Sequence, residues 1–257
     1  MYNIDIHSYH IYIDYNKIIE LINNKDLRFF KHKKYLLFYL LNYIDTGLYI
    51  YTCSWDLSYL KNAYELSKNI NNKNFIKYLC YFEYEEDIIE YLSGIKNNND
   101  ENKSVIILPY FRNFLDYKLE KSDLIECIKQ IILIIYTALF KYNIIYTDLS
   151  IDNILIIYKK KRKTFKINNK KYTVNGYNII FNDFININQV KDSSNISFDI
   201  IYQFYTSIVY IMEQLNKNYN IGDFLSFLNE INIYSHNIIH PFKIIDTILY
   251  QLNNSIL

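Results

Sequence analysis

The chain has 257 residues, 51% of them hydrophobic, and is therefore long enough to bury a sizeable core. Its 28 Lys and Arg side chains nearly balance 27 Asp and Glu, and the net charge of +1 gives no specific signal for nucleic acid. The three cysteines are isolated in the sequence, which excludes a disulfide framework or a zinc site and is typical of a reducing compartment.

The N-terminal part of the chain contains no targeting signal and alternates apolar runs with turns. Asp5 and His7 stand where a signal peptide needs a basic start and an apolar run, and no later window reaches about 18 uninterrupted apolar residues. We therefore expect a soluble, intracellular protein with no membrane segment. A short strand is predicted over residues 10–13 and a short helix over 16–22. The turn Asp45-Thr46-Gly47 between two apolar runs predicts a β-hairpin.

A helix carrying Glu65 is predicted over residues 55–70, where apolar side chains recur at helical spacing. The strand before it, residues 49–53, contains no Lys, and the nearest upstream lysines are Lys31, Lys33 and Lys34. The chain has only four glycines, and no two of them are near neighbours, so the sequence excludes a Gly-rich phosphate-binding loop. By itself, Glu65 is equally consistent with an exposed helix carboxylate.

A buried type of strand is predicted over residues 105–111, after a polar loop at 97–103. Its apolar run stops at Pro109, which lacks an N–H but keeps its carbonyl, whereas Tyr110 and Phe111 keep both backbone groups. This strand end therefore offers backbone hydrogen bonds to a ligand, or else it is an ordinary edge strand that proline terminates. A short helix is expected at 115–119.

Residues 130–157 form the most informative stretch, in which a long apolar helix leads through a tight polar turn into a β-branched strand. We expect Ser122 and Asp123 to cap this helix. The turn holds Asp148 and Asn153, five residues apart, with Leu149 as a buried anchor. In phosphoryl transfer, one Asp must meet the acceptor hydroxyl while an Asn on the same loop reaches the metal ion beside the phosphates. The alternative is that both are simply turn-forming residues.

A second candidate acid, Asp183, follows an apolar strand that begins at residue 178. Between this strand and the loop at 148 lie a basic run at 159–163 and a second apparent pair of strands, which flanks Asn168 and Asn169. This pattern predicts one elongated hairpin. An apolar helix then begins near Asp199, and two further helices are predicted at 222–231 and 241–252.

These motifs resemble those of the protein kinases. The sequence Y-T-D-L-S-I-D-N at 146–153 resembles the catalytic loop H-R-D-L-x-x-x-N, although Ser150 replaces the usual Lys. Asp183-Phe184 resembles the D-F-G motif, with Ile185 in place of Gly. The elongated hairpin resembles the haspin branch and, as closely, the virion-associated Ser/Thr kinase of poxviruses, which also matches the later Ile238-Ile239-His240-Pro241. The resemblance covers residue 65 to the end of the chain.

The resemblance implies an α+β, bilobed protein kinase-like fold. A small mixed N-lobe with a reduced sheet would span residues 1–107, and a mostly helical C-lobe would span 108–257. The implied activity is ATP- and Mg²⁺-dependent phosphoryl transfer to Ser or Thr of a protein substrate, in the cytoplasm, nucleus or virion. The roles that follow are catalysis for Asp148, metal binding for Asn153 and Asp183, contact with a phosphate-binding Lys for Glu65, adenine contact for Pro109, Tyr110 and Phe111, and support of the catalytic loop for Asp199.

Two other functions are open at this point. A catalytically impaired pseudokinase that acts as a binding scaffold is favoured by the missing strand Lys, the missing Gly-rich loop, Ser150 and Ile185. A small-molecule kinase of the aminoglycoside or choline type is favoured by the short segment before Asp199, whereas the elongated hairpin argues against it.

Overall fold

The computed structural model has two compact units, Met1–Phe111 and Arg112–Leu257. The first is rich in strands and the second is mostly helical, so the predicted α+β class is confirmed. The residues that the structure describes are 2–6, 9–13, 28–33, 36–43, 46–53, 57–78, 80–83, 104–109, 112–147, 149–167, 169–182, 184, 187–190, 197–231 and 241–254.

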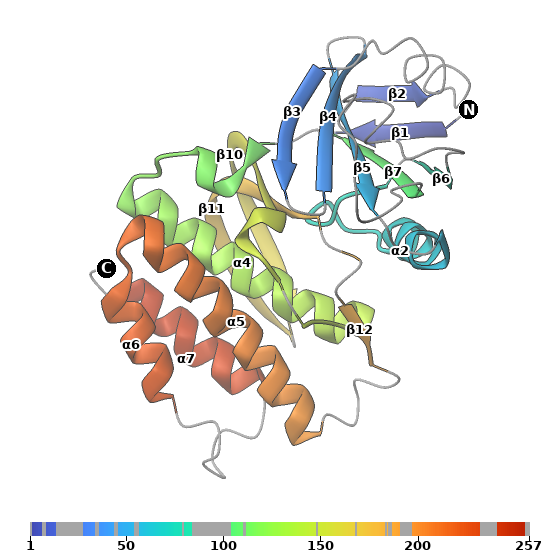
Figure 1. Ribbon diagram of the computed structural model, residues 1–257. Helices are drawn as coiled ribbons and strands as arrows, with labels where there is room; N and C mark the ends of the chain where they lie inside the picture. Colours follow the sequence, from blue (N-terminus) through green and yellow to red (C-terminus); the bar gives the residue numbers. More distant parts are fainter. Residues whose placement is uncertain are drawn as a thin grey trace. The chain divides into compact units, whose positions relative to one another are not determined.

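The first unit is built on antiparallel strands. They are β1 (Tyr2–Ile6), β2 (Tyr9–Ile13), β3 (Arg28–Lys33), β4 (Leu36–Tyr43), β5 (Thr46–Cys53), β6 (Cys80–Glu83) and β7 (Ser104–Pro109). The last five form one sheet in the order β3-β4-β5-β7-β6, and β1 pairs with β2 (Figure 1). The predicted hairpin is confirmed, because Tyr43 pairs with Thr46 at the turn between β4 and β5. The helix expected at 16–22 lies outside the described residues.

Helix α2 (Leu57–Asn69) packs on β6 and β7 through a single apolar stripe. Within this stripe, Tyr64 lies 5.1 Å from Tyr81 of β6, measured between ring centroids. The ammonium group of Lys77 folds back and donates a hydrogen bond to the carbonyl of Ser67 and another to that of Ile70. Since the last carbonyls of a helix have no partner within it, this contact completes the C-terminus of α2. Burial lowers the pKa of Lys77.

The second unit surrounds helix α4 (Lys121–Tyr142), which is mostly buried between Asp123 and Leu139. The other helices are α5 (Phe198–Tyr219), α6 (Gly222–Glu230) and α7 (Pro241–Asn254). Both α5 and α7 lie beside α4, and α6 packs on α5 (Figure 1). Interleaved isoleucines and leucines fill the contacts, so truncating one of them to Ala would lower the free energy of unfolding by about 2–5 kcal/mol. Among them are Ile128, Ile131, Ile132, Ile208, Ile211, Ile244, Ile245 and Ile248.

The remaining elements of this unit are strands and single turns. They are β8 (Arg112–Asn113), the 3₁₀ turn η1 (Phe114–Asp116), β9 (Ile144–Tyr146), the 3₁₀ turn η2 (Ile151–Asn153), β10 (Ile154–Ile167), β11 (Lys170–Phe181) and β12 (Ile187–Gln189). The predicted elongated hairpin is present as β10–β11, with a register shift between Ile157 and Lys161. Asn169 adopts a φ of 67° at its turn, a left-handed conformation that Asn tolerates better than most residues.

Strand β11 lies unusually close to α4. The side-chain amide of Gln130 donates a hydrogen bond of 2.8 Å to the carbonyl of Tyr177. A Cβ atom at the neighbouring Gly176 would lie only 3.1 Å from the amide nitrogen of Gln130. The glycine therefore favours the close approach of strand and helix, and this contact holds the hairpin on the helical core.

Two local predictions were wrong. Residues 115–119 do not form a helix. The single turn η1 begins with a capping box between Asn113 and Asp116, and it ends at Tyr117, which is extended. Helix α4 has Glu120 as its N-cap rather than Ser122. Asp123 lies in its first turn, where its carboxylate forms an ion pair of 2.7 Å with Lys160 of β10. Among the described residues, no helix combines the length and the apolar character that crossing a membrane requires.

Candidate active site

Of the two polar residues predicted to act in the loop, Asp148 and Asn153, the structure describes Asn153. It is the last residue of η2, is half-buried, and is followed directly by β10. Leu149 is buried with 1% of its surface exposed, as the sequence predicts. The residues Asp148, Asp183, Tyr110 and Phe111 lie outside the described residues. Their roles therefore stay predictions, which depend on how the described residues on either side of them are arranged.

Strands β9 and β12 bring the two acid-bearing segments together. Tyr146 pairs with Ile187, and Ile144 pairs with Gln189, in an antiparallel ladder. Asp148 follows Tyr146 by two residues in the sequence, and Asp183 precedes Ile187 by four. Tyr146 stands at the position of the kinase His and is a core residue, since its ring packs edge-on against Phe181 at 5.5 Å.

The hairpin joins the same two segments from the other side. Its first strand begins directly after Asn153, and its second strand ends at Phe181, which pairs with Ile154. One residue beyond this pair, the backbone N–H of Asn182 donates a hydrogen bond of 2.9 Å to the carbonyl oxygen of Asn153. The predicted metal ligand Asn153 is thus bonded to the residue that precedes Asp183 in the sequence.

The loop around η2 is held by local bonds and by β8. The hydroxyl oxygen of Ser150 caps η2 by accepting from the backbone N–H of Asp152, and the N–H of Asn153 donates to the Ser150 carbonyl. From outside the loop, the side-chain amide of Asn113 donates a hydrogen bond of 2.8 Å to the carbonyl of Asp152. These contacts fix the backbone on both sides of Asn153 and limit the positions that its side chain can take.

Helix α5 holds the loop through two residues that the sequence analysis missed. The buried hydroxyl of Ser207 donates to the carbonyl of Tyr146 at 2.5 Å. Gln214 accepts from the N–H of Ile151 at 2.8 Å and donates to the carbonyl of Leu149 at 3.4 Å. Ser207 and Gln214 are seven residues apart, which places them two turns apart on one face of the helix. The sequence signal that could have indicated this contact is Ser207, a small polar residue on an otherwise apolar face of the helix.

Within the described part of the loop, Ser207 and Gln214 make the contacts that were expected of Asp199. Asp199 lies in the first turn of α5 and is exposed, and it makes no hydrogen bond to the described part of the loop. Its position favours the N-terminus of the helix through the helix dipole. The supporting contacts come instead from Ser207 and Gln214, which lie two and four turns further along the helix.

The nucleotide-binding residues predicted in the first unit have clear positions on its elements. Glu65 lies on the exposed face of α2 and forms no ion pair within the described residues. Strand β5, which precedes α2, has the sequence TGLYIYTC and contains no Lys. Lys31 and Lys33 lie on β3, which β4 separates from β5. Pro109 ends β7 opposite Leu48 of β5. Because β6 pairs with β7 on the other side, β7 is an inner strand and not an edge strand.

The predicted donor set has the chemistry that Mg²⁺ prefers. Magnesium takes hard oxygen ligands, and the carboxylate of Asp183 with the side-chain amide oxygen of Asn153 would meet this preference. Asn153 is half-buried on a backbone that neighbouring residues fix, which suits a ligand that must hold its geometry. Among the described residues, which do not include Asp148 and Asp183, no three His, Cys, Asp or Glu side chains could together hold a metal ion.

The chain is similar to known proteins at the level of solved structures. No protein-family model matches it, and no curated protein matches it. It is similar to the kinase domain of the Plasmodium protein PF14_0431, with 15% identity and a TM-score of 0.45. That match covers 72% of this chain and 62% of the kinase domain. The chain therefore spans less than two thirds of the length of that kinase domain.

A second solved structure, WaaP in complex with acyl carrier protein, is similar with 6% identity and a TM-score of 0.49. The match covers 91% of this chain and 92% of WaaP. At identities of 15% and 6% and TM-scores of 0.45 and 0.49, these likenesses carry no conclusion about activity. Neither description names haspin or a poxvirus kinase, so the branch to which the sequence is similar stays a prediction.

Proposed function

We propose that this chain catalyses phosphoryl transfer from ATP to the hydroxyl group of a protein Ser or Thr, with Mg²⁺ as cofactor. Asp148 would orient the hydroxyl and accept its proton, and Asn153 and Asp183 would hold the metal ion. Glu65 would pair with a phosphate-binding Lys, and Pro109, Tyr110 and Phe111 would contact adenine. The chain would represent a divergent branch, similar to haspin and the poxvirus virion kinase.

The observation that carries this proposal is the hydrogen bond from Asn182 to the carbonyl of Asn153. It joins the end of the loop that contains Asp148 to the residue before Asp183. The ladder between β9 and β12 joins the same two segments on their other sides. If Asp148, Asn153 and Asp183 were only turn-forming residues, the fold would need neither the hydrogen bond nor the ladder. The chemistry needs both segments together, because positioning and charge neutralisation supply most of the rate enhancement.

The protein residues and the metal ion would have separate tasks. When bound, Mg²⁺ neutralises charge on the phosphates of the nucleotide. The residues of this chain would hold the acceptor hydroxyl and fix the loop, and Ser207 and Gln214 are the supports of that loop on α5. They would act as positioning residues, since their bonds reach the loop backbone.

One observation favours a scaffold as a second candidate. Strand β5 contains no Lys, so the ion pair that holds a catalytic Lys against the phosphates has no obvious donor there. A chain that kept the fold without this contact would bind partners without transferring phosphate. A small-molecule kinase is the third candidate, and the same transfer experiment distinguishes it.

The test is phosphate transfer from γ-labelled ATP in the presence of Mg²⁺. Casein and histone serve as protein acceptors, and a panel of small alcohols serves as the alternative. We expect label on a protein Ser or Thr with the native chain, and none with Asp148→Asn. Asp223→Asn, which changes an exposed acid in the first turn of α6, is the matched control and should retain activity. Label on the alcohols alone, or undiminished activity of Asp148→Asn, would contradict the proposal.

A further inference from the structure

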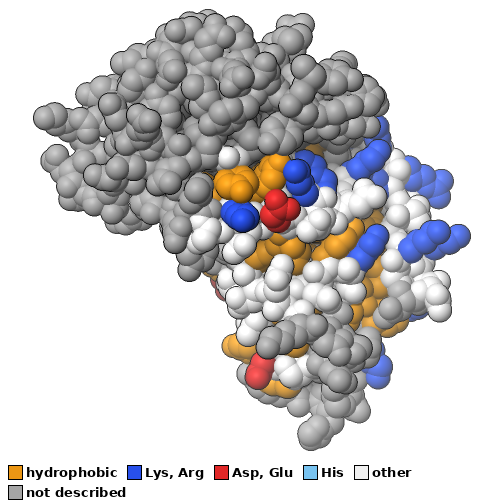
Figure 2. Space-filling view, turned by 90° about the vertical axis from the view of Figure 1, so that its right-hand side faces the viewer, with side chains coloured by type: hydrophobic (Ala, Val, Ile, Leu, Met, Phe, Trp, Pro, Cys, Tyr) orange, Lys and Arg blue, Asp and Glu red, His pale blue; other side chains and the backbone are white. Residues whose placement is uncertain are grey.

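The β10–β11 hairpin concentrates positive charge in an otherwise acidic chain. Residues 154–181 contain eight Lys and Arg and no Asp or Glu, whereas the whole chain has a net charge of +1. The remainder of the chain therefore has a net charge of −7. In Figure 2, the charged side chains on the right-hand part of the described surface are all Lys or Arg. Separation of this degree creates a local field that favours an anionic partner.

The two faces of the hairpin differ in composition. The inward face, with Phe165, Ile167 and Val174, is half-buried or buried against the helices. The opposite side of the hairpin, which points away from the helices, consists of three cross-strand pairs, and all six of their residues are exposed. These outward pairs are Arg162 with Asn175, Thr164 with Thr173, and Lys166 with Lys171. We call these six residues the outward face.

The cations of the outward face have no carboxylate partner among the described residues. Two neighbouring lysines do, because Lys160 pairs with Asp123 and Lys170 pairs with Asp246. By contrast, Lys166 and Lys171 stand directly opposite each other across the strands. Like charges in this position destabilise a sheet by a few tenths of a kcal/mol up to about 1 kcal/mol. An anion bound over the pair would remove this repulsion.

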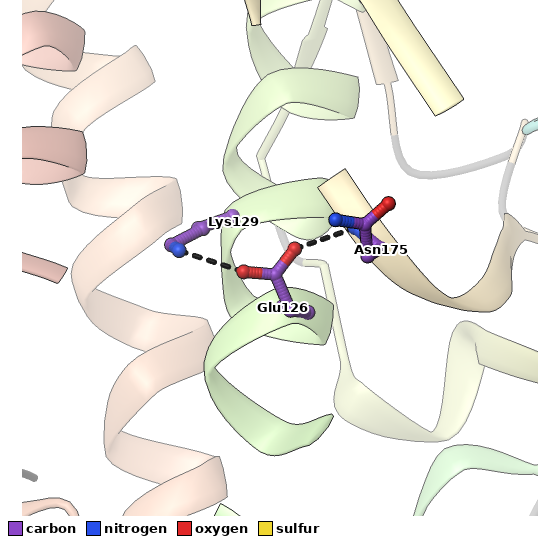
Figure 3. A network of polar contacts seen from close by, with 3 residues as sticks. All are labelled: Glu126, Lys129 and Asn175. Atoms are coloured by element: carbon purple, nitrogen blue, oxygen red, sulfur yellow. Dashed lines mark hydrogen bonds and ion pairs between the residues drawn. The ribbon is translucent and has the colours of Figure 1, made fainter. Parts of the chain in front are cut away.

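A hydrogen bond to helix α4 holds the hairpin that carries the outward face. The carboxylate of Glu126 on α4 accepts a hydrogen bond of 2.6 Å from the backbone N–H of Asn175 (Figure 3). Its other oxygen forms an ion pair of 2.7 Å with Lys129, so this acid is already engaged. At the tip of the hairpin, an open hollow of about 440 Å³ is lined by Lys166, Asn169, Lys170 and Lys171. This hollow can take a carboxylate or a phosphate group.

The spacing of the outward face suits an extended polypeptide. Arg162, Thr164 and Lys166 alternate along β10, so successive outward residues are about 6.6 Å apart. In an extended peptide, two acids four residues apart are about 13 Å apart, which matches the separation of Arg162 and Lys166 along β10. The face spans about 13 Å between Arg162 and Lys166, which about five residues of such a peptide would cover.

Nucleic acid fits this face less well. The outward face contains no aromatic side chain on which a base could stack. A long duplex would also extend beyond the hairpin over a chain whose remaining net charge is −7, and its phosphates would be repelled there. We propose that the outward face of the β10–β11 hairpin is a docking site for an extended, acidic polypeptide segment. This site goes beyond the proposed phosphoryl transfer and does not depend on it.

The test is direct binding to the full chain, measured by fluorescence anisotropy without ATP. The probe is a labelled peptide of about ten residues in which Glu alternates with Ser, and the same peptide with Gln is the neutral control. The variant Arg162→Gln/Lys166→Gln/Lys171→Gln should bind the Glu peptide about tenfold more weakly, the effect of three exposed ion pairs. The matched control, Lys118→Gln/Lys121→Gln/Lys217→Gln, removes three exposed charges outside the hairpin and should bind like the native chain.

Several outcomes would overturn the proposal. They are equal weakening in both triple variants, equal binding of the neutral peptide, and no binding of the Glu peptide at low salt. Tighter binding of a duplex DNA of similar charge, lost in the hairpin variant, would assign the face to nucleic acid. A dimer of the native chain that the hairpin variant abolishes would assign the face to a second copy. Circular dichroism would check that each variant is folded. Removing the lysine pair should not impair folding, because it removes a repulsion between like charges across the strands.

Discussion

The backbone N–H of Asn182 lies 2.9 Å from the carbonyl oxygen of Asn153 and donates a hydrogen bond to it. The two residues are 29 positions apart in the sequence, and the β10–β11 hairpin between them brings them together. Asn153 closes the loop that resembles the kinase catalytic loop, and Asn182 precedes the acid that resembles the kinase D-F-G motif. The hairpin therefore connects the two motifs on which the proposed function rests.

Replacing Gln214 should loosen the loop. Gln214→Ala removes the acceptor of the Ile151 N–H and the donor to the Leu149 carbonyl. We expect the free energy of unfolding to fall by about 1–2 kcal/mol, measured by urea denaturation. If the chain transfers phosphate, kcat should fall at least about tenfold with little change in KM for ATP, because the loop and not the nucleotide is displaced.

The neighbouring Glu213→Ala is the control for this prediction, since Glu213 is exposed on the same helix. Gln214→Glu keeps an acceptor for Ile151 but loses the donor to Leu149, so its kcat should lie between those of the native chain and Gln214→Ala. Equal effects of the changes at 213 and 214 would show that Gln214 does not hold the loop.

Adding a methyl group at Gly176 should strain the contact between the hairpin and α4. The new Cβ would lie 3.1 Å from both the Gln130 amide nitrogen and the Glu126 Cβ. We expect Gly176→Ala to lower the free energy of unfolding by about 1–3 kcal/mol, as overpacking does. Gly222→Ala is the contrasting control, because its Cβ would meet only the Asn216 side-chain oxygen at 3.9 Å in the first turn of α6. That change should leave stability unchanged or raise it. The opposite order of stabilities would refute the close approach.

The pH dependence of stability above pH 10 should reflect a buried tyrosine. Burial raises the pKa of Tyr205 to about 12, and its hydroxyl donates to the carbonyl of Leu228 on α6. In the unfolded chain this pKa is about 10. The contribution of Tyr205 to stability is therefore fully present below about pH 10 and is lost as the pH rises towards about 12.

Tyr205→Phe should be less stable than the native chain at neutral pH, but the difference should shrink between about pH 10 and pH 12. Denaturant unfolding at a series of pH values measures this difference. Tyr250→Phe changes a side chain that is 70% exposed and should follow the native chain throughout. A difference between Tyr205→Phe and the native chain that stays constant with pH would contradict this account.

The thiol of Cys127 should be inert in the folded chain. It is fully buried on α4, and desolvation, with a smaller effect from the charge of Asp123, raises its pKa to about 12. Because the thiolate is the reactive form, iodoacetamide at neutral pH should leave Cys127 unmodified until denaturant is added. Mass spectrometry of the peptide that contains Cys127 gives the extent of alkylation. Rapid alkylation without denaturant would show that this part of α4 is accessible.

Much of the fold follows from local patterns in the sequence. The isoleucines of α4 recur at helical spacing, and Asp45-Thr46-Gly47 and Asn168-Asn169 mark the turns of two hairpins. Local patterns failed at residues 115–119, where the helical structure is limited to the single turn η1 and the backbone becomes extended at Tyr117. They also favoured Asp199 as the support of the loop. Ser207 and Gln214 reach that loop across more than 60 residues of sequence, and such contacts depend on tertiary packing that no local pattern encodes.

The most direct test of the central claim is the effect of ATP on the melting temperature, with and without Mg²⁺. The account predicts that ATP with Mg²⁺ raises the melting temperature of the native chain by several degrees, more than ATP alone. Asp183→Ala and Asn153→Ala should lose the part of the rise that depends on Mg²⁺, whereas Asp223→Asn should keep it. No shift with ATP under either condition, or a full Mg²⁺-dependent shift in both site variants, would contradict the claim that these residues form a shared nucleotide and metal site.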